Sequence, residues 1–543
     1  MLIDANECDS LACVHSDICI VGAGIAGLAL AAEFLGSKQR VVLLEAGNDN
    51  ISRPSQSFYQ GQMSGAPAHS LTQSRVRSFG GSGKQWTGQC IAMEGIDFEP
   101  RPTLPDSGWP ITRKDLNPYY HRANAFFGIS ASELDLDCWI SREGALQPAA
   151  TQNLRGNIIR FATPLDVGKN NRTALFKSSN VDVYLNAPVV SLNLAKDDKQ
   201  METATVKLNN GQALRFQARF FVIAAGGIEN SRLLLVSNTQ RAAGLGNEHD
   251  NVGRYFMDHP YLTPGYWHPS ATVVAPPLSL IEDFRALAAG RAAHAAYSLS
   301  EPLRTQESLL GCGGYFISME DYQLRSEYFS RGSQALVALA DVAKRQRLPD
   351  TDIISLVGDL IKDRHPAAST LSRRIRAVLQ PQPRYALRLQ VESPPLRHSR
   401  VTLSSDKDRL GMPKVHVHWC LGADAWRSVD RFRDVLAHTI DRQGLGCLVE
   451  LSSSNDEGWP SSMLGGKHHM GGTRMHRDPR SGVVNEHLRV HTLANCYVAG
   501  SSVFPTGSWV NPTLTLVALT IRLADELKIK LRDIAMQDLP ELC

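Results

Sequence analysis

The chain lacks three features that would narrow its class. It has no Cys-x-x-Cys pair, no excess of one charge and no unbroken apolar run long enough to span a membrane. Its ten cysteines are scattered, so the expected environment is a reduced, cytoplasmic one. Lysine and arginine number 57 against 54 acidic residues, a balance that argues against nucleic acid as the main partner.

The most apolar stretch, residues 18–35, is broken by three glycines and carries Glu33 near its end. This pattern predicts a strand, a turn and a helix rather than a transmembrane segment. The first residues are acidic and lack the basic region of a secretion signal, so we expect no signal peptide. At 543 residues, two domains that share a cleft are the natural expectation.

A glycine-rich turn follows the first buried strand, in the order Gly22-Ala-Gly24-Ile-Ala-Gly27. The first glycine permits a tight turn, the second lets the backbone approach a pyrophosphate, and the third lets helix and strand pack closely. Glu45 ends the next strand, at residues 41–44, where its carboxylate can accept hydrogen bonds from ribose hydroxyls. Strand, turn, helix and acid are all present, so the sequence predicts a dinucleotide site.

Two further segments favour FAD over NAD. Residues 220–227 form a second apolar strand and Gly-Gly turn, followed by a helix at about 228–235, as in the closing unit of an FAD domain. The loop at 77–88 contains Gly80, Gly81, Gly83 and Gly88 and has no place in a plain NAD domain. Hairpin-like segments at 181–194 and 204–218, and a helix at about 114–127, are also expected.

At this point the chain resembles the glucose–methanol–choline (GMC) oxidoreductase family over nearly all of its length. The segments that carry the resemblance are the glycine-rich loop, residues 108–120, 251–260, 399–403 and 411–413, and His468-His469-Met-Gly-Gly-Thr with Asn511-Pro-Thr. The branch that contains pyranose 2-oxidase looks closest. Its covalent flavin link depends on a histidine before Trp-Thr in the loop, where this chain has Gln85. The resemblance therefore implies non-covalent FAD.

The same resemblance implies further cofactor contacts. Thr87 is expected near the N5/O4 edge of the flavin, and the backbone of Val189 at the adenine end. Other residues expected to contact FAD are Gly80, Gly81, Gly500, Ser501 and Pro512.

A catalytic pair is expected from the C-terminal motifs. Oxidation of an alcohol by a flavin needs a base for the hydroxyl proton, a role that suits histidine, and a hydride acceptor at flavin N5. The family pattern assigns the base to His469 and its partner to Asn511, which would hold the substrate oxygen. His468 stays open as the alternative base. Asn511 also suits a helix N-cap with Pro512 at the first helical position, and the two roles are compatible.

Three residues are candidates for substrate contact. Lys467 and Trp509 precede His469 and Asn511 by two residues, so on extended backbone each would share a side with its neighbour. Gln390, on a strand expected at 385–392, could offer its amide to a sugar hydroxyl. The plain alternatives are a solvent-facing Lys467, a core Trp509 and a solvated Gln390. We expect no metal site, because no cysteine or carboxylate is suitably spaced from the paired histidines.

The dinucleotide-type features return after residue 465, so we predict a discontinuous cofactor domain. The expected fold is α/β: an FAD-binding Rossmann-type domain of residues 14–100, 181–258 and 463–535, and an inserted α+β substrate-binding domain. The insert, residues 101–180 and 259–462, is expected to be built on an antiparallel sheet. It would contain a strand at 415–419, a helical stretch at 334–380 and a basic surface at 344–376.

The function expected from these features is FAD-dependent oxidation of a secondary alcohol, on a sugar or glycoside, with oxygen or a quinone as electron acceptor. A homo-oligomer is left open. The alternatives are oxidation of a bulky lipophilic alcohol such as a sterol, a non-redox GMC-type lyase, and a non-catalytic binding protein.

Overall fold

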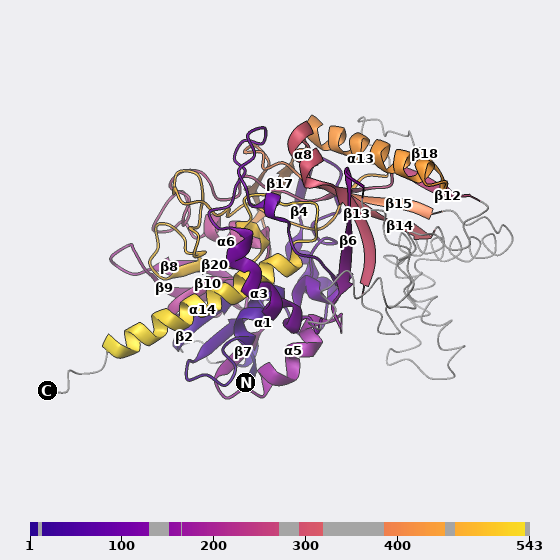
Figure 1. Ribbon diagram of the computed structural model, residues 1–543. Helices are drawn as coiled ribbons and strands as arrows, with labels where there is room; N and C mark the ends of the chain where they lie inside the picture. Colours follow the sequence, from indigo (N-terminus) through magenta and orange to yellow (C-terminus); the bar gives the residue numbers. More distant parts are fainter. Residues whose placement is uncertain are drawn as a thin grey trace, which may run out of the picture.

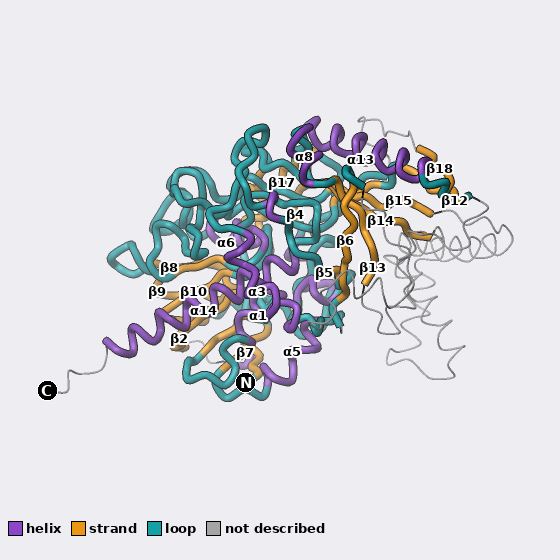
Figure 2. Tube along the Cα trace, viewed as in Figure 1, coloured by secondary structure: helices purple, strands orange, loops and turns teal. Residues whose placement is uncertain are grey.

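The computed structural model describes residues 1–8, 13–129, 151–163, 165–270, 293–318, 385–450 and 462–537. Within these ranges the chain builds two large sheets and one small one, and each large sheet has a buried apolar cluster of its own (Figures 1 and 2). The predicted helical stretch at 334–380 and the basic surface at 344–376 lie outside the described residues.

The first sheet has the order β1-β7-β3-β2-β10-β9-β8, with β20 paired to β10. Its parallel part comprises β1 (Leu2–Asp4), β7 (Val181–Leu185), β3 (Val41–Leu44), β2 (Cys13–Val21), β10 (Ala213–Ile223) and β20 (Cys496–Val498). The strands β9 (Met201–Lys207) and β8 (Val189–Leu194) extend it in antiparallel sense. The C-terminal strand β20 thus joins the N-terminal strands in one sheet.

The hairpin predicted at 181–194 is wrong, because β3, β2, β10 and β9 lie between β7 and β8 in this sheet. β7 pairs in parallel with β3, and four of its five side chains are buried, as expected for a strand covered on both faces. The hairpin predicted at 204–218 is confirmed by the antiparallel pair β9 and β10. β10 continues through the strand predicted at residue 220.

Helices cover this sheet and fix its glycine-rich turns. α1 (Ile25–Ala32) starts directly after the first turn and is apolar throughout, because it is packed between the sheet and the helices α5 (Val167–Phe176) and α14 (Thr513–Gln537). α14 also packs on α3 (Arg113–Phe126), and α6 (Glu229–Val236) follows the second turn. The remaining helices of three residues or more are α2 (Arg53–Gln56), α8 (Glu301–Glu307) and α13 (Ala423–Arg442), with short 3-10 turns at Ala5–Glu7, Ser57–Tyr59, Gly81–Lys84, Gly95–Asp97 and Ser501–Val503.

The second sheet is antiparallel, as predicted, in the order β18-β12-β15-β14-β13-β6-β5, with β11 beside β15 and β19 beside β11. Its strands are β18 (Gly446–Glu450), β12 (Gly265–Pro269), β15 (Tyr385–Val391), β14 (Cys312–Ser318), β13 (Ala293–Leu299), β6 (Leu154–Phe161), β5 (Gln89–Cys90), β11 (Pro260–Leu262) and β19 (Leu464–Gly465). The small sheet contains β16 (Arg400–Lys407), β17 (Pro413–Trp419) and β4 (Gly61–Gly65).

Some segments of each predicted domain lie in the layer that the other domain mainly builds. α3 and α5, from the range 101–180, pack with α1 and α14 on the first sheet, whereas β5 and β19 join the second. Because β5 and β19 come directly from the cofactor-side segments 80–88 and 463–470, both layers meet at one site.

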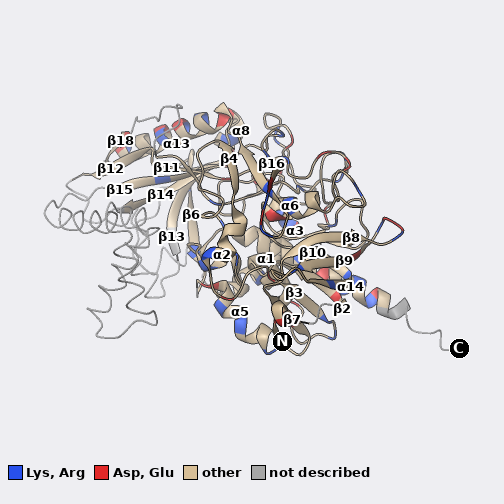
Figure 3. Ribbon diagram, turned by 180° about the vertical axis from the view of Figure 1, so that it is seen from behind, with Lys and Arg blue, Asp and Glu red and all other residues tan. Residues whose placement is uncertain are grey.

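Charged residues of both signs alternate along the exposed faces of α13 and α14 (Figure 3). On α13, Arg427 pairs with Asp424 and Arg433 with Asp430. No helix among the described residues is long and apolar enough to cross a membrane.

Candidate active site

The turn after β2 forms a cradle with one open side. A side chain at Gly27 would place its Cβ 1.9 Å from the Gly22 carbonyl oxygen, and one at Gly22 would meet the Ala224 carbonyl at 2.6 Å. A Cβ at Gly24 would meet no atom within 4 Å, and the same holds for Gly226 in the second turn. Gly24 caps α1 without a side-chain hydrogen bond, so the first helical N–H groups face this open space. This arrangement fits a pyrophosphate.

The glycine-rich loop lies on top of the first turn. The Gly80 N–H donates to the Ala23 carbonyl at 2.9 Å, and a Cβ at Gly81 would come within 2.9 Å of the Gly24 Cα. Gly80 and Gly81 both have positive φ, at 93° and 53°, which explains the glycines at these positions. The predicted residues Gly80 and Gly81 are therefore brought to the first glycine turn.

Glu45 ends β3 beside the same turn. Its carboxylate accepts the N–H groups of Ala23 at 3.0 Å and Gly47 at 2.7 Å. Burial raises its pKa, against the opposing effect of those two bonds. The Glu45 carbonyl accepts the Ala187 N–H, so Val189, two residues on, starts β8 close by. The two residues that the sequence predicts at the adenosine end of FAD therefore lie close to each other.

The C-terminal motif completes the cradle. Gly500 has a φ of 114°, and the Ser501 hydroxyl donates to the His469 carbonyl at 2.7 Å. The Pro512 carbonyl accepts the first bond of α14, from Leu516. Thr87, in the glycine-rich loop, has an exposed side chain. Open backbone at the two turns and the carboxylate of Glu45 together fit an FAD molecule.

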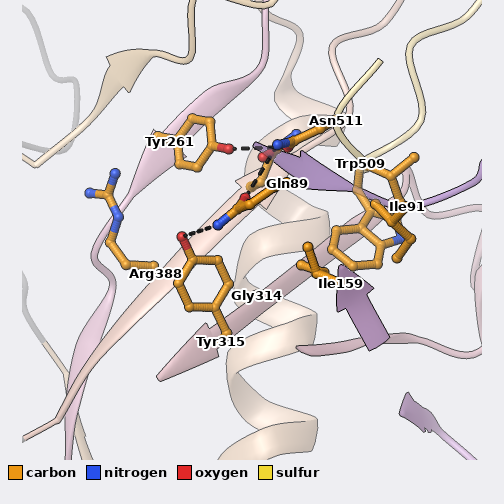
Figure 4. A pocket seen from close by; sticks show the side chains of 12 residues that line it. Gln89, Ile91, Ile159, Tyr261, Gly314, Tyr315, Arg388, Trp509 and Asn511 are labelled. Atoms are coloured by element: carbon orange, nitrogen blue, oxygen red, sulfur yellow. Dashed lines mark hydrogen bonds between the residues drawn. The ribbon is translucent and has the colours of Figure 1, made fainter. Parts of the chain in front are cut away.

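A small pocket lies between the second sheet and the loop before α14 (Figure 4). Tyr261 on β11 is paired with Gln390 on β15, and Tyr315 on β14 with Arg388. Directly opposed residues, and residues two apart on a strand, share one face of a sheet, so these four side chains form the floor. The other lining residues are Gln89, Ile91, Ile159, Gly313, Gly314, Trp509, Val510 and Asn511.

Asn511 makes its side-chain hydrogen bonds inside this pocket. Its Oδ1 accepts from the Tyr261 hydroxyl at 3.3 Å, and its Nδ2 donates to the Gln89 Oε1 at 3.2 Å. Gln89 in turn donates to the Tyr315 hydroxyl at 3.3 Å. Because α14 begins at Thr513, Asn511 lies just outside the helix. The predicted helix start is therefore one residue early, and the amide of Asn511 is directed to the pocket.

His468 belongs to the same polar group through two neighbours. Its ring packs edge-on against Tyr261, with 5.9 Å between centroids, and its Nδ1 lies 2.9 Å from the Nδ1 of His259. The amide nitrogen of Gln390 lies 2.6 Å from that same His259 atom. Burial lowers the pKa of His259 to about 4 and holds that of His468 well below its usual value, so both rings are neutral near pH 7.

His469 has different surroundings. Its ring packs against Phe256, with centroids 5.8 Å apart, and a Cβ at Gly227 would come within 2.7 Å of the His469 Cβ. Burial, and then the positive charges of Arg75 and Lys467, lower its pKa to about 3. No group of three or more His, Cys, Asp and Glu side chains in the described part of the chain could hold a metal ion.

The predicted substrate residues divide into two groups. Gln390 and Trp509 line the pocket, and Trp509 packs so closely on β14 that a Cβ at Gly313 would lie 2.5 Å from its ring. Lys467 lies on the side of His469, where its charge acts on His69 and His469. Its own N–H donates to Asp258 at 3.2 Å.

Sequence reasoning missed five residues that form or support this pocket. Arg388 could have been found, because it precedes Gln390 by two residues on a predicted strand. Tyr261 follows the motif Asp258-His259-Pro by one residue, but no local pattern connects it to Asn511. Gln89 and Tyr315 are brought in by pairing between distant strands, and His259 by contacts with His468 and the loop before α14, which leave no local signal.

Comparison with known proteins agrees with this geometry. Residues 17–242 match the family model described as FAD dependent oxidoreductase, and residues 395–520 match that of GMC oxidoreductase. The chain is 24% identical to a 6'''-hydroxyparomomycin C oxidase from Streptomyces lividus over 93% of this chain and 90% of that protein. It is 26% identical to the fructose dehydrogenase large subunit of Gluconobacter japonicus, over 58% of this chain and 48% of that subunit.

Among solved structures, pyridoxine 4-oxidase from Mesorbium loti has the same fold, with a TM-score of 0.55 and 16% identity over 95% of this chain and 99% of the other. Fold and cofactor cradle together define an FAD-dependent oxidoreductase. The C-terminal part of the chain, residues 395–520, matches the GMC oxidoreductase family, as its motifs predict.

Proposed function

We propose that this protein uses non-covalently bound FAD to oxidise a secondary alcohol of a sugar or glycoside to the carbonyl. The observation that carries the proposal is the meeting of Asn511, Tyr261 and Gln390 in one pocket, with the His259–His468 pair bonded directly behind Gln390. A neutral histidine and a carboxamide are the groups that hydroxyl oxidation needs.

Each residue has a defined role in the proposal. Bound FAD supplies the hydride acceptor. His468 takes the hydroxyl proton on Nε2, because its Nδ1 faces His259. Asn511 holds the substrate oxygen with the amide that now donates to Gln89, and Tyr261 keeps that amide oriented through its bond to Oδ1.

We infer that the base is His468, the second of the two sequence alternatives. The contacts of His468 run to His259 and to Tyr261, which is bonded to Asn511, whereas those of His469 run to Phe256 and Gly227.

The substrate class follows from the lining. Besides Trp509, six of the twelve lining residues offer a hydrogen-bonding side chain: Gln89, Tyr261, Tyr315, Arg388, Gln390 and Asn511. So many polar groups favour a polyhydroxylated ring over a sterol. The one charged side chain among these described lining residues is Arg388. Trp509 offers an apolar wall for a sugar ring. Two relatives act on compounds of sugar type by their names, a fructose dehydrogenase and a hydroxyparomomycin oxidase.

Two variants test the proposal. His468→Ala should slow anaerobic flavin reduction by a sugar alcohol by ~10²–10⁴-fold, the usual contribution of a positioned base. His469→Ala is the matched control, because it removes the adjacent imidazole, and it should keep a rate within about tenfold of the wild type. Both proteins are assayed at equal FAD content. If His469→Ala is the damaging change and His468→Ala is mild, the assignment of the base is wrong.

The same assay separates the alternative functions. Flavin bleaching by a sugar or glycoside without air excludes a non-redox lyase, and bleaching by sterols but by no sugar would overturn the substrate class. Admission of oxygen or of a quinone to the reduced protein then identifies the electron acceptor.

A further inference from the structure

His259 is a fully buried histidine to which neither the family motifs nor the cofactor cradle assign a role. Its Nε2 lies 2.8 Å from the carbonyl oxygen of Ser508 and 3.3 Å from that of Gly507. A carbonyl oxygen only accepts hydrogen bonds, so Nε2 carries the hydrogen. A neutral imidazole has one N–H, which leaves Nδ1 of His259 as an acceptor.

The neighbours of Nδ1 are consistent with this tautomer. The Gln390 amide nitrogen, at 2.6 Å, donates to it. The Nδ1 of His468, at 2.9 Å, must then also carry a hydrogen and share the single lone pair of His259 Nδ1 with Gln390, because two ring nitrogens without hydrogen would repel each other. If the Nδ1 of neutral His468 holds the hydrogen, its Nε2 carries a lone pair.

The geometry points to His259 as a positioning residue that holds His468 in the Nδ1–H tautomer and so keeps its Nε2 free to accept a proton. The proton path is balanced: the substrate hydroxyl proton moves to His468 Nε2, His468 becomes an imidazolium, and its Nδ1–H stays bonded to His259. This inference rests on the proposed role of His468 as the base.

The surrounding backbone holds the two rings at this separation. The Asp258 carboxylate accepts the N–H groups of His259 at 2.8 Å, His468 at 2.7 Å and Lys467 at 3.2 Å, so it joins the two segments directly beneath the rings. On the far side, the Ser508 hydroxyl donates to Asp97 at 2.6 Å. The carbonyl oxygens that fix Nε2 of His259 are thereby held in place.

Asp97 is itself fixed by a buried ion pair. The Arg304 side chain is 1% exposed. Its guanidinium lies 2.9 Å from the Asp97 carboxylate and 3.7 Å from the Glu392 carboxylate. A buried pair of this kind is costly to break, so it keeps the loop before α14 in one conformation. The His259–His468 pair thus lies between two rigid segments.

The direct test is the tautomer of His468, read from ¹⁵N–¹H correlation spectra of protein with ¹⁵N-labelled histidine, with the His468→Ala variant to assign the signal. The expected result is a hydrogen on Nδ1 and none on Nε2 near pH 7, with or without FAD. A hydrogen on Nε2 of His468 in the wild-type protein overturns the inference.

Two near-isosteric variants separate orientation from packing. The amide of His259→Asn occupies the place of Nδ1 and can accept from His468, whereas the amide of His259→Gln occupies the place of Nε2 and keeps only the bond to Ser508. We expect His259→Asn to retain the Nδ1–H signal and a flavin reduction rate within about tenfold of wild type. His259→Gln should lose that signal and reduce about 10²-fold more slowly, with the substrate KM and FAD content unchanged.

The outcomes distinguish the two proposals. If His468→Ala does not slow reduction, the proposed base fails whatever the tautomer. If His468→Ala slows reduction but His259→Gln keeps both the signal and the rate, only the role of His259 fails. Equal loss of rate in His259→Asn and His259→Gln, with unchanged His468 signals, would show that His259 serves packing alone.

Discussion

Two glycines of the same turn give opposite expectations for one methyl group. At Gly24 the φ and ψ of −76° and −172° are open to alanine, and a Cβ would meet nothing within 4 Å. At Gly27 a Cβ would lie 1.9 Å from the Gly22 carbonyl oxygen. Gly24→Ala should therefore fill the space that FAD needs without harm to the apoprotein, whereas Gly27→Ala should harm the fold itself.

The magnitudes follow from these distances. Alanine for glycine at an unstrained position changes the free energy of unfolding by about +0.4 to +1 kcal/mol, so apo Gly24→Ala should be as stable as the wild type or slightly more so. Gly27→Ala forces helix and turn apart, and overpacking of this kind costs about 1–3 kcal/mol. Loss of one backbone N–H bond to a charged phosphate costs about 1.5–3 kcal/mol, which corresponds to a fall in FAD affinity of about 10–100-fold for Gly24→Ala.

The assay needs the apoprotein, thermal unfolding and an FAD titration followed by flavin fluorescence. Gly95→Ala is the matched control, because its Cβ would also meet nothing within 4 Å while it lies outside the turn. Wild-type FAD affinity in Gly24→Ala would show that the open side of the turn is not the pyrophosphate site. A Gly27→Ala protein with unchanged stability would refute the packing argument.

Three further predictions concern the cofactor, the pocket and pH. Because Gln85 stands where the linking histidine of relatives would be, acid denaturation should release all flavin into the supernatant, and flavin in the protein pellet would contradict this. Asn511→Asp and Asn511→Ser should both fold but reduce about 10²-fold more slowly in stopped-flow assays, with Asp also lowering the flavin potential; near-wild-type rates in both would leave Asn511 a structural residue. In the folded protein His259 stays neutral down to about pH 4, whereas in the unfolded chain it is protonated below about pH 6.5. Its contribution to the free energy of unfolding is therefore complete above pH 6.5. That contribution is lost as the pH falls to 4, by up to about 3 kcal/mol. Burial raises the pKa of Asp258 to about 6, so Asp258 changes the stability in the opposite direction as the pH falls. The prediction is therefore checked by comparing variants: the loss of stability between about pH 6.5 and 4.5 should be smaller in His259→Asn than in wild type.

The parts of the fold that sequence predicts well are those with a local cause. The strand at 41–44 and the turn glycines are fixed by neighbours in sequence, and the structure has them where the pattern predicts. The prediction of a hairpin at 181–194 failed for a physical reason. A turn at Asn186 with a φ of 53° suits a hairpin, but the buried side chains of β7 need cover on both faces, and β7 pairs in parallel with β3 on one side and β1 on the other.

The choice between His468 and His469 shows what local pattern cannot provide. Adjacent residues on extended backbone face opposite ways, so sequence establishes that only one of the two can reach a given pocket, but not which one. The answer depends on residues that are distant in the chain: Tyr261, about 200 positions earlier, touches His468 and bonds Asn511. His259 then limits His468 to one tautomer, through carbonyl oxygens on the loop that carries Asn511. The proton acceptor and the residue that holds the substrate oxygen are thus positioned by the same short loop, so a change that moves residues 507–511 should disturb both together.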